Sequence, residues 1–122
     1  MKRQKLLTKF LSSYKKRLAS LIDSIDVEML ESIINAMIVA FKNGNTLYVV
    51  GNGGSAATAS HIQADFRYFV RYFTDFRPKV VSLTDNIPLM TAISNDDSYE
   101  NVFVEQMKGL FEKGDLLLAI SA

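Results

Sequence analysis

Apolar residues recur at steps of three and four over residues 3–25, the spacing that places them on one face of an α-helix. The residues of this stripe are Leu7, Leu11, Tyr14, Leu18, Leu21 and Ile25. A second helix is predicted from Asp26, a residue type that caps helix N-termini, through Phe41. Gly44 follows where a left-handed residue usually ends a helix. The first 44 residues therefore predict an N-terminal helical hairpin.

The rest of the chain alternates predicted strands with predicted helices. Short apolar runs predict buried strands at residues 46–50, 79–83 and 115–120. Helices are expected over residues 56–73, over 88–93, and from Ser98 to the glycine at 114. Such alternation is typical of parallel βαβ units with right-handed crossovers. The predicted fold class is α/β, an open parallel sheet with flanking helices on both faces, preceded by the helical hairpin.

The runs at 46–50 and 115–120 lack the polar alternation of a strand with one solvated face, so their apolar residues should be covered on both sides of the sheet. The residues expected to be buried are Val49, Val50, Leu117 and Leu118.

A glycine-rich turn, Gly51-Asn52-Gly53-Gly54-Ser55, separates the first predicted strand from the following helix. Glycines let the backbone approach a ligand, and the first-turn amides of a helix attract anions. The turn is neither the dinucleotide fingerprint G-x-G-x-x-G nor a P-loop, because no lysine follows its glycines. Nucleoside triphosphate hydrolysis is therefore disfavoured, and no nucleotide cofactor is expected. A tight connection without any ligand is the alternative to an anion site.

His61, the only histidine, lies four residues before Asp65 and thus shares one helix face with it. Such a pair can bind a divalent metal or share a proton. The alternative is a surface pair that stabilises the helix by about 0.2–0.5 kcal/mol. Ligands in open α/β sheets bind at the carboxyl ends of the strands, and this pair follows the glycine-rich turn there. The position favours a functional role.

Composition narrows the function classes further. Fourteen basic against thirteen acidic residues give a net charge of +1, which argues against nucleic-acid binding. With no cysteine, thiolate catalysis, disulfides and cysteine zinc sites are excluded. No apolar run is long enough to span a membrane, and the basic N-terminus lacks the apolar stretch of a signal peptide. A cytoplasmic protein without membrane partners is expected.

Taken together, these motifs resemble the sugar isomerase (SIS) domain of the phosphoheptose isomerases. The resemblance rests on the turn with Ala56 and Ala57, on His61 and an acid at 65, and on three further stretches. Those stretches are Leu83-Thr84-Asp85, residues 92–96 (AISND) and residues 114–121 (GDLLLAIS). The resemblance divides the chain into an oligomerisation hairpin at residues 1–44 and the first part of a sugar-phosphate-binding SIS domain at residues 45–122.

The resemblance implies an aldose–ketose isomerisation. Sedoheptulose 7-phosphate would be converted to a heptose 7-phosphate through an enediol, in the biosynthesis of heptose for lipopolysaccharide or capsule. It also implies a homotetramer with residues 3–43 central to the interface. The first helix fits this assignment because Leu6, Phe10 and Ile22 form a second apolar strip beside the stripe described above.

The resemblance also implies roles for individual residues. The substrate-binding positions are Asn52, Gly53, Gly54, Ser55, Asp96 and Ser121. Asp96 would contact sugar hydroxyls, and Ser121 would open the loop that holds the phosphate. His61 and Asp65 are the implied catalytic residues, with the acid at 65 moving a proton between adjacent carbons. In some members the residues at these two positions help to bind zinc, so they are also the implied ligands of Zn²⁺.

Two departures from the family pattern bear on this assignment. Position 65 is Asp65 where the family has glutamate, which retracts the carboxylate by roughly 1.5 Å, one carbon–carbon bond. Displacements of this size can cost on the order of a hundredfold in rate. The sequence also stops before the rest of the phosphate loop and before a later helix that supplies a glutamine and a second histidine. A longer natural protein is therefore expected.

Two non-catalytic functions are the alternatives to an isomerase. One relative of the heptose isomerases binds the bacterial replication initiator and lacks glutamate at the position of Asp65, so an SIS protein that binds a macromolecule is the first. An SIS domain that senses a sugar phosphate without converting it is the second. An acid at position 65 favours the isomerase, because a pure binder needs no carboxylate there.

Overall fold

The structure is a computed structural model that describes residues 2–75 and 77–121. The chain divides into two compact units, one up to Ile34 and one from Asn35 onward. Among the described helices, none is both long and apolar enough to cross a membrane.

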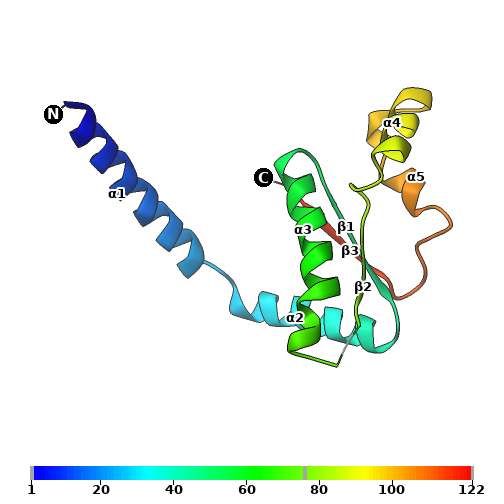
Figure 1. Ribbon diagram of the computed structural model, residues 1–122. Coiled ribbons are helices and arrows are strands. Elements are labelled where there is room, and N and C mark those ends of the chain that lie inside the picture. The colour runs from blue at the N-terminus through cyan, green and yellow to red at the C-terminus, as the bar shows by residue number, and fades with distance from the viewer. Residues whose placement is uncertain (1, 76, 122) are drawn as a thin grey trace. The chain divides into compact units, whose positions relative to one another are not determined.

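Two consecutive helices precede the sheet, as predicted (Figure 1). They are α1 (Lys2–Asp23) and α2 (Val27–Lys42). Asp26 caps α2, because its Oδ1 accepts a hydrogen bond of 2.9 Å from the amide of Met29. Gly44 has a φ of 78°, which confirms the left-handed residue expected after this helix. No residue of α1 is buried, although its apolar residues follow the helical period.

The second unit is built on a three-stranded parallel sheet of β1 (Thr46–Gly51), β2 (Lys79–Ser82) and β3 (Leu116–Ile120). The strand order is β2-β1-β3, so the first strand in sequence is the central one. In register, Leu47 of β1 lies opposite Val80 of β2 and Leu116 of β3. All three predicted strands and the α/β class are confirmed.

Both faces of the central strand are covered. On one face, buried Leu47 and Val49 pack with Ala59 of α3 (Gly54–Tyr68), and Phe41 of α2 joins them. Figure 1 shows α3 lying alongside the sheet on this face. On the other face, Tyr48, Val50 and Leu83 form a second cluster, packed by Phe103 and Met107. The alternation of side chains along β1 thus supplies two small cores from one strand.

The helices after β1 and β2 differ from expectation only at their ends. The α3 helix begins with the last glycine of the turn and ends at Tyr68, and the 3₁₀ turn η1 (Val70–Tyr72) follows it. The α4 helix (Ile87–Asp96) is capped by Asn86, whose side chain accepts from the amide of Leu89, and it carries a proline in its first turn.

The helix expected from Ser98 to residue 114 is wrong. This segment forms a 3₁₀ turn, η2 (Tyr99–Asn101), and one short helix, α5 (Val104–Met107), and Ser98 makes no side-chain cap. Gly109 has a φ of 78°, which a helix cannot continue through. The buried Gln106 side chain donates to the carbonyls of Leu83 and Val102, so tertiary contacts set the path of the backbone here.

The burial predicted for Leu117 is also wrong, whereas Val49 and Val50 are buried as expected and Leu118 is partly buried. Leu117 is 45% exposed. Its neighbours Leu116 and Leu118 pack against the cluster on the α3 face, so Leu117 points to the opposite face. Because β3 is an edge of this sheet, the elements that cover the same face of β1 do not cover Leu117.

Candidate functional site

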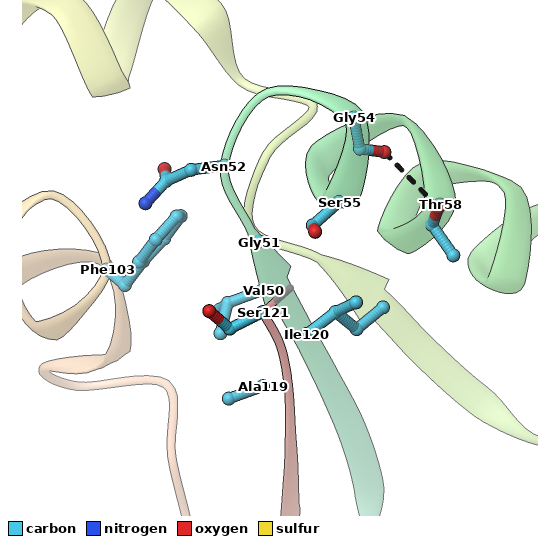
Figure 2. A pocket seen from close by; sticks show the side chains of 10 residues that line it. All are labelled: Val50, Gly51, Asn52, Gly54, Ser55, Thr58, Phe103, Ala119, Ile120 and Ser121. Carbon is cyan, nitrogen blue, oxygen red and sulfur yellow. Dashed lines mark hydrogen bonds between the residues drawn. The ribbon is translucent and has the colours of Figure 1, made fainter. Parts of the chain in front are cut away.

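A pocket of about 840 Å³ lies where β1 and β3 end and α3 begins (Figure 2). Its lining residues are Val50, Gly51, Asn52, Gly54, Ser55, Thr58, Phe103, Ala119, Ile120 and Ser121. The carboxyl ends of parallel strands are where ligands bind in open α/β sheets. The glycine-rich turn is therefore part of a cavity, rather than a tight connection alone.

Two glycines of the turn are required by its geometry. A Cβ on Gly51 would lie 2.6 Å from the carbonyl oxygen of Ser55, closer than non-bonded atoms can approach. Gly53 has a φ of 57°, a conformation that residues with a side chain rarely adopt. The helix starts at once, because the amides of Ser55 and Ala56 bond to the carbonyls of Asn52 and Gly53 at 3.0 and 3.1 Å. The sequence Gly-Asn-Gly-Gly-Ser thus folds β1 directly into α3.

Neutral polar groups supply the chemistry of the pocket. Figure 2 shows the hydroxyl oxygens of Ser55, on α3, and Ser121, after β3, turned into the cavity from different elements. Thr58 also lines it, and its Oγ1 donates to the carbonyl of Gly54 at 3.2 Å. Hydroxyls and the N-terminus of α3 can donate to the oxygens of an anionic or polyhydroxylated ligand. Within the described residues, no charged side chain lines this pocket.

The fold thus brings Asn52, Gly54, Ser55 and Ser121 together, and Ser121, just after β3, follows the others by more than sixty residues. Gly53 is in the same turn but does not line the cavity. Of the predicted substrate-binding positions, Asp96 lies elsewhere. It ends α4 and lines a separate hollow of about 390 Å³ with Asp97 and Glu105.

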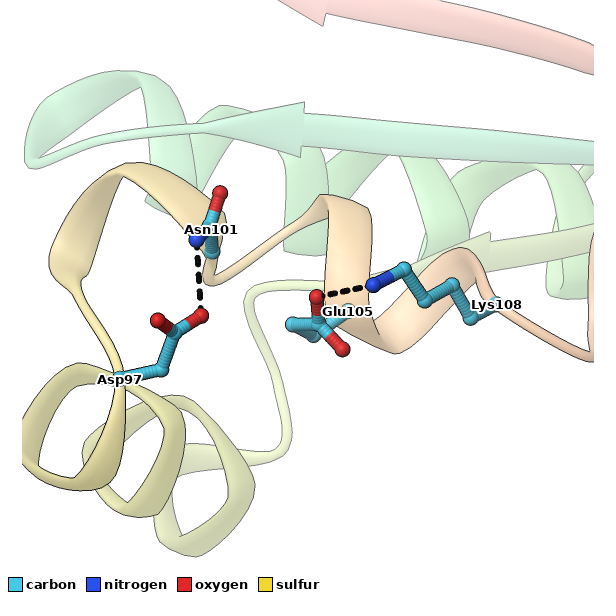
Figure 3. A network of polar contacts seen from close by, with 4 residues as sticks. All are labelled: Asp97, Asn101, Glu105 and Lys108. Carbon is cyan, nitrogen blue, oxygen red and sulfur yellow. Dashed lines mark hydrogen bonds and ion pairs between the residues drawn. The ribbon is translucent and has the colours of Figure 1, made fainter.

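The hollow beside Asp96 is bordered by local polar contacts (Figure 3). Asp97 accepts a hydrogen bond of 2.7 Å from Nδ2 of Asn101, and Glu105 forms an ion pair with Lys108. The hydrogen bond to Glu105 raises the pKa of the Lys108 ammonium. Asp96 itself accepts from its neighbour Asn95 at 2.8 Å. These acidic residues are therefore engaged with neighbours on the same short stretch of chain.

His61 and Asp65 form the predicted pair on α3. Nε2 of His61 lies 3.4 Å from Oδ2 of Asp65, and the two side chains are 76% and 44% exposed. Neither residue is among those that line the pocket of the glycine turn. In residues 2–75 and 77–121, no group of three or more His, Cys, Asp or Glu could hold a metal ion. The pair offers two ligands, whereas a catalytic zinc usually takes three from protein.

A network of hydrogen bonds connects α3 to the end of β2. Nε2 of Gln63 donates to Oδ2 of Asp85 at 2.7 Å, and Oε1 of Gln63 accepts from the amide of Ser82 at 2.6 Å. The buried Thr84 hydroxyl donates to the carbonyl of Ala56 at 3.2 Å. These contacts fix the rotation of α3 about its axis, so they determine the face on which His61 and Asp65 lie.

Sequence reasoning missed Thr58 and Phe103 as pocket residues, and Tyr99 as a partner of Asn52. Thr58 had a usable signal, since it lies one helical turn after Gly54 on the stripe that leads to His61. Phe103 and Tyr99 had no such signal in the sequence, because their segment does not form the long helix that its spacing predicts. Only the packing of Phe103 against Tyr48 and Val50 brings this segment to the pocket.

Comparison with known proteins agrees with this arrangement. Residues 9–122 match the SIS domain family. The phosphoheptose isomerase of Clostridium acetobutylicum is 37% identical over 110 residues, which cover 90% of this chain and 56% of that protein. The phosphoheptose isomerase of a Bradyrhizobium species is 41% identical over 102 residues, covering 82% of this chain and 50% of that protein. The chain spans about half the length of the curated relatives it matches.

Solved structures show the same likeness. The chain resembles the phosphoheptose isomerase of Neisseria gonorrhoeae with a TM-score of 0.78 and 28% identity, covering 100% of this chain and 61% of that one. Three findings lead to one assignment. The sheet is parallel with strand order β2-β1-β3, a glycine turn borders a pocket at the carboxyl end of β1, and residues 9–122 match one family. The chain belongs to the SIS domain family.

Proposed function

We propose that this chain carries the sugar-phosphate side of the active site of a phosphoheptose isomerase, which interconverts sedoheptulose 7-phosphate and a heptose 7-phosphate. The pocket at the glycine turn is the main support, because it presents the Ser55 and Ser121 hydroxyls and the start of α3 to one cavity. The relatives named phosphoheptose isomerase support the choice of substrate.

In this proposal, neutral donors bind the sugar phosphate. The turn residues Asn52, Gly53, Gly54 and Ser55 and the Ser121 hydroxyl surround the ligand. Because helix N-termini and hydroxyls bind phosphate oxygens without a lysine or arginine, the lack of a charged side chain among the described lining residues is compatible with this ligand. Asp96 contacts a sugar hydroxyl at the far end of the substrate, which requires the ligand to extend beyond the pocket.

Asp65 is the proposed proton carrier. Its carboxylate takes a proton from the hydroxyl-bearing carbon beside the substrate carbonyl, which gives the enediol as its monoanion. The proton of the neighbouring hydroxyl passes to the former carbonyl oxygen, and Asp65 returns its proton to the former carbonyl carbon, so the carbonyl forms on the neighbouring carbon. His61 lies next to it and orients the carboxylate through their 3.4 Å contact. The pair would hold Zn²⁺ only with ligands from outside the described residues, so no step is assigned to a metal.

The proposed assembly is a cytoplasmic homotetramer that serves heptose biosynthesis for lipopolysaccharide or capsule. Residues 1–44 form its oligomerisation hairpin, and residues 45–122 form the first part of the SIS domain. Exposed apolar side chains along α1, including Leu6, Phe10 and Ile22, support an interface there, because single chains rarely leave so much apolar surface in water.

A non-catalytic SIS protein is the second candidate, binding either a macromolecule or a sugar phosphate. Two observations favour it: residue 65 is an aspartate, and its side chain pairs with His61 outside the lining of the main pocket. A binder of this kind would keep the glycine turn and would need no carboxylate near the reacting carbons.

Replacement of Asp65 distinguishes the two candidates. The protein is used as its gene encodes it, including any residues beyond position 122. Asp65→Asn removes only the proton acceptor, so isomerisation of sedoheptulose 7-phosphate should fall by about 10²–10⁴-fold while binding of the sugar phosphate is retained. Calorimetric titration measures the binding, and a coupled assay measures the conversion.

Asp65→Glu is the matched variant, because it restores the missing methylene and keeps the charge. An isomerase with a retracted carboxylate should keep its rate or gain from the longer side chain. If the unaltered protein converts no heptose phosphate and Asp65→Glu creates no activity, the non-catalytic candidate is correct.

A further inference from the structure

The Asn52 side chain is held by a hydroxyl from a distant part of the chain. Tyr99 opens η2, and its Oη donates to Oδ1 of Asn52 at 2.7 Å, across 47 positions of sequence. This distance is typical of a well-formed O–H···O hydrogen bond. Asn52 lines the pocket and Tyr99 does not, so the contact connects a pocket residue to a support behind it.

The contact fixes the place of the Asn52 side chain at the edge of the pocket. An asparagine amide has an acceptor oxygen and a donor nitrogen, and rotation by half a turn exchanges them. Because the Tyr99 hydroxyl can donate to Oδ1 or accept from Nδ2, it holds the amide in place in either orientation, and in this structure it donates to Oδ1. Figure 2 shows Nδ2 on the side of Phe103, another lining residue, and Oδ1 turned the other way. Within the described part of the chain, Nδ2 of Asn52 donates no hydrogen bond.

Tyr99 can act as a support because its segment is anchored. Four residues later, Phe103 packs against the cluster of Tyr48, Val50 and Leu83. The buried side chain of Gln106 donates to the carbonyl of Leu83 at 3.0 Å. These contacts tie the η2–α5 segment to the second face of the sheet, so the Tyr99 hydroxyl is placed by the core rather than by a free loop.

We propose that Tyr99 is a positioning residue for the ligand, which holds the Asn52 side chain at the pocket so that its amide can bond to the ligand. This inference rests on the proposed function for the identity of the ligand, although the Tyr99–Asn52 contact itself does not.

Tyr99→Phe removes the hydroxyl and keeps the ring. In the protein as its gene encodes it, KM for sedoheptulose 7-phosphate should rise about threefold to tenfold, the range expected for one hydrogen bond, while kcat changes little. The thermal midpoint should stay unchanged, since both side chains are exposed. A fall in the thermal midpoint with KM unchanged would show that the bond only stabilises the fold, and would overturn the proposal.

A double-mutant cycle tests whether Tyr99 acts through Asn52. In an Asn52→Ala background, Tyr99→Phe should have no further effect on KM, because the group that it positions is already gone. Equal effects of Tyr99→Phe with and without Asn52 would contradict the inference. Tyr72→Phe is the matched control: it also removes the hydroxyl of an exposed tyrosine, which accepts from Arg71 at 2.9 Å and does not line the pocket. It should leave KM unchanged.

A failure of the proposed function can be distinguished from a failure of the Tyr99 inference. If the unaltered protein neither binds nor converts sedoheptulose 7-phosphate, the substrate assignment is wrong. The Tyr99 inference is then tested by NMR of protein labelled with ¹⁵N-asparagine. The side-chain amide signals of Asn52 are assigned by their loss in Asn52→Ala. Tyr99→Phe should shift these signals, and signals that do not move would overturn the inference.

Discussion

The strand β1 is predicted from a short apolar run and the helix α1 from apolar residues at helical spacing, yet only the residues of β1 are buried. In β1, five of the six residues are buried. In α1, which is 22 residues long, none is buried. Two strands, α3 and the segment around Phe103 surround β1, whereas the described residues provide α1 with no such cover. The apolar residues of a sequence identify which side chains could be buried, and only neighbouring elements bury them.

A similar contrast occurs within α3. Its first turn is tied to β1, because Gly51 lies against the backbone of Ser55 and the amide of Ser55 bonds to Asn52. Two turns later, His61 and Asp65 contact one another and remain largely accessible. The end of the helix that lines the pocket is therefore built into the core of this unit, whereas the proposed catalytic pair depends on what approaches its exposed face.

The largest expected effect on stability is that of Gly51→Ala. A Cβ at this position meets the backbone of Ser55, which cannot move without displacing the start of α3. The free energy of unfolding should fall by about 3 kcal/mol or more, as for a severe overpacking. Urea denaturation measures the change. Gly54→Ala is the control, since a Cβ there has nothing within 4 Å, and an equal loss in both variants would refute the steric explanation.

A smaller effect is expected for Asp115→Asn, which acts where β1 and β3 begin. Oδ1 of Asp115 accepts from the amide of Thr46 at 2.7 Å, and Oδ2 accepts from the amide of Glu112 at 2.9 Å. An asparagine can accept only one of these bonds. The variant should lose about 1–2 kcal/mol of unfolding free energy at pH 7.

The pH dependence of this contribution has a defined sign. The amide of Thr46, followed by other donors, holds the pKa of Asp115 below its ordinary value of 3.8. A carboxyl group with a lowered pKa in the folded state stabilises the protein above its unfolded-state pKa, and this contribution is lost as the pH falls through the folded-state pKa. The difference between the unaltered protein and Asp115→Asn should therefore shrink below about pH 4. A constant difference from pH 7 to pH 2.5 would contradict this explanation.

The smallest effect on the stability of a single chain is expected in α1. Phe10 is 63% exposed, so Phe10→Asp removes little buried surface and should change the unfolding free energy of one chain by at most about 0.5 kcal/mol. Its effect should appear in the assembly instead, because a charge would enter the proposed tetramer interface. Light scattering should show smaller species at micromolar concentration. Lys16→Ser on the same helix is the control, and tetramers that survive Phe10→Asp would place the interface elsewhere.

Local features of the sequence predicted much of this fold. Asp26 as a helix cap, Gly44 after α2 and the proline in the first turn of α4 were predictable, because each acts on residues within one helical turn. The three strands were equally predictable from short apolar runs. The glycine turn at the pocket could be predicted because its composition suits close backbone approach.

The segment after α4 could not be predicted in this way. Its apolar spacing suits a helix, yet the Gln106 side chain bonds to the carbonyl of Leu83, and Gly109 has a positive φ that interrupts a helix. Leu117 has the sequence context of a buried strand, and its exposure follows from its place at a sheet edge. Both outcomes depend on contacts between residues far apart in the sequence, which periodicity does not contain.

The sequence by itself determined the order of helices and strands, the turn that folds β1 into α3, and the helix face shared by His61 and Asp65. The tertiary structure alone decided that Ser121 and Phe103 join Ser55 in one pocket, that Tyr99 holds Asn52, and that the His61–Asp65 pair lies outside the pocket lining. The physical reason is the range of the forces involved. Backbone conformation and helix periodicity depend on near neighbours, whereas a binding pocket depends on the packing of a sheet that joins segments up to seventy residues apart.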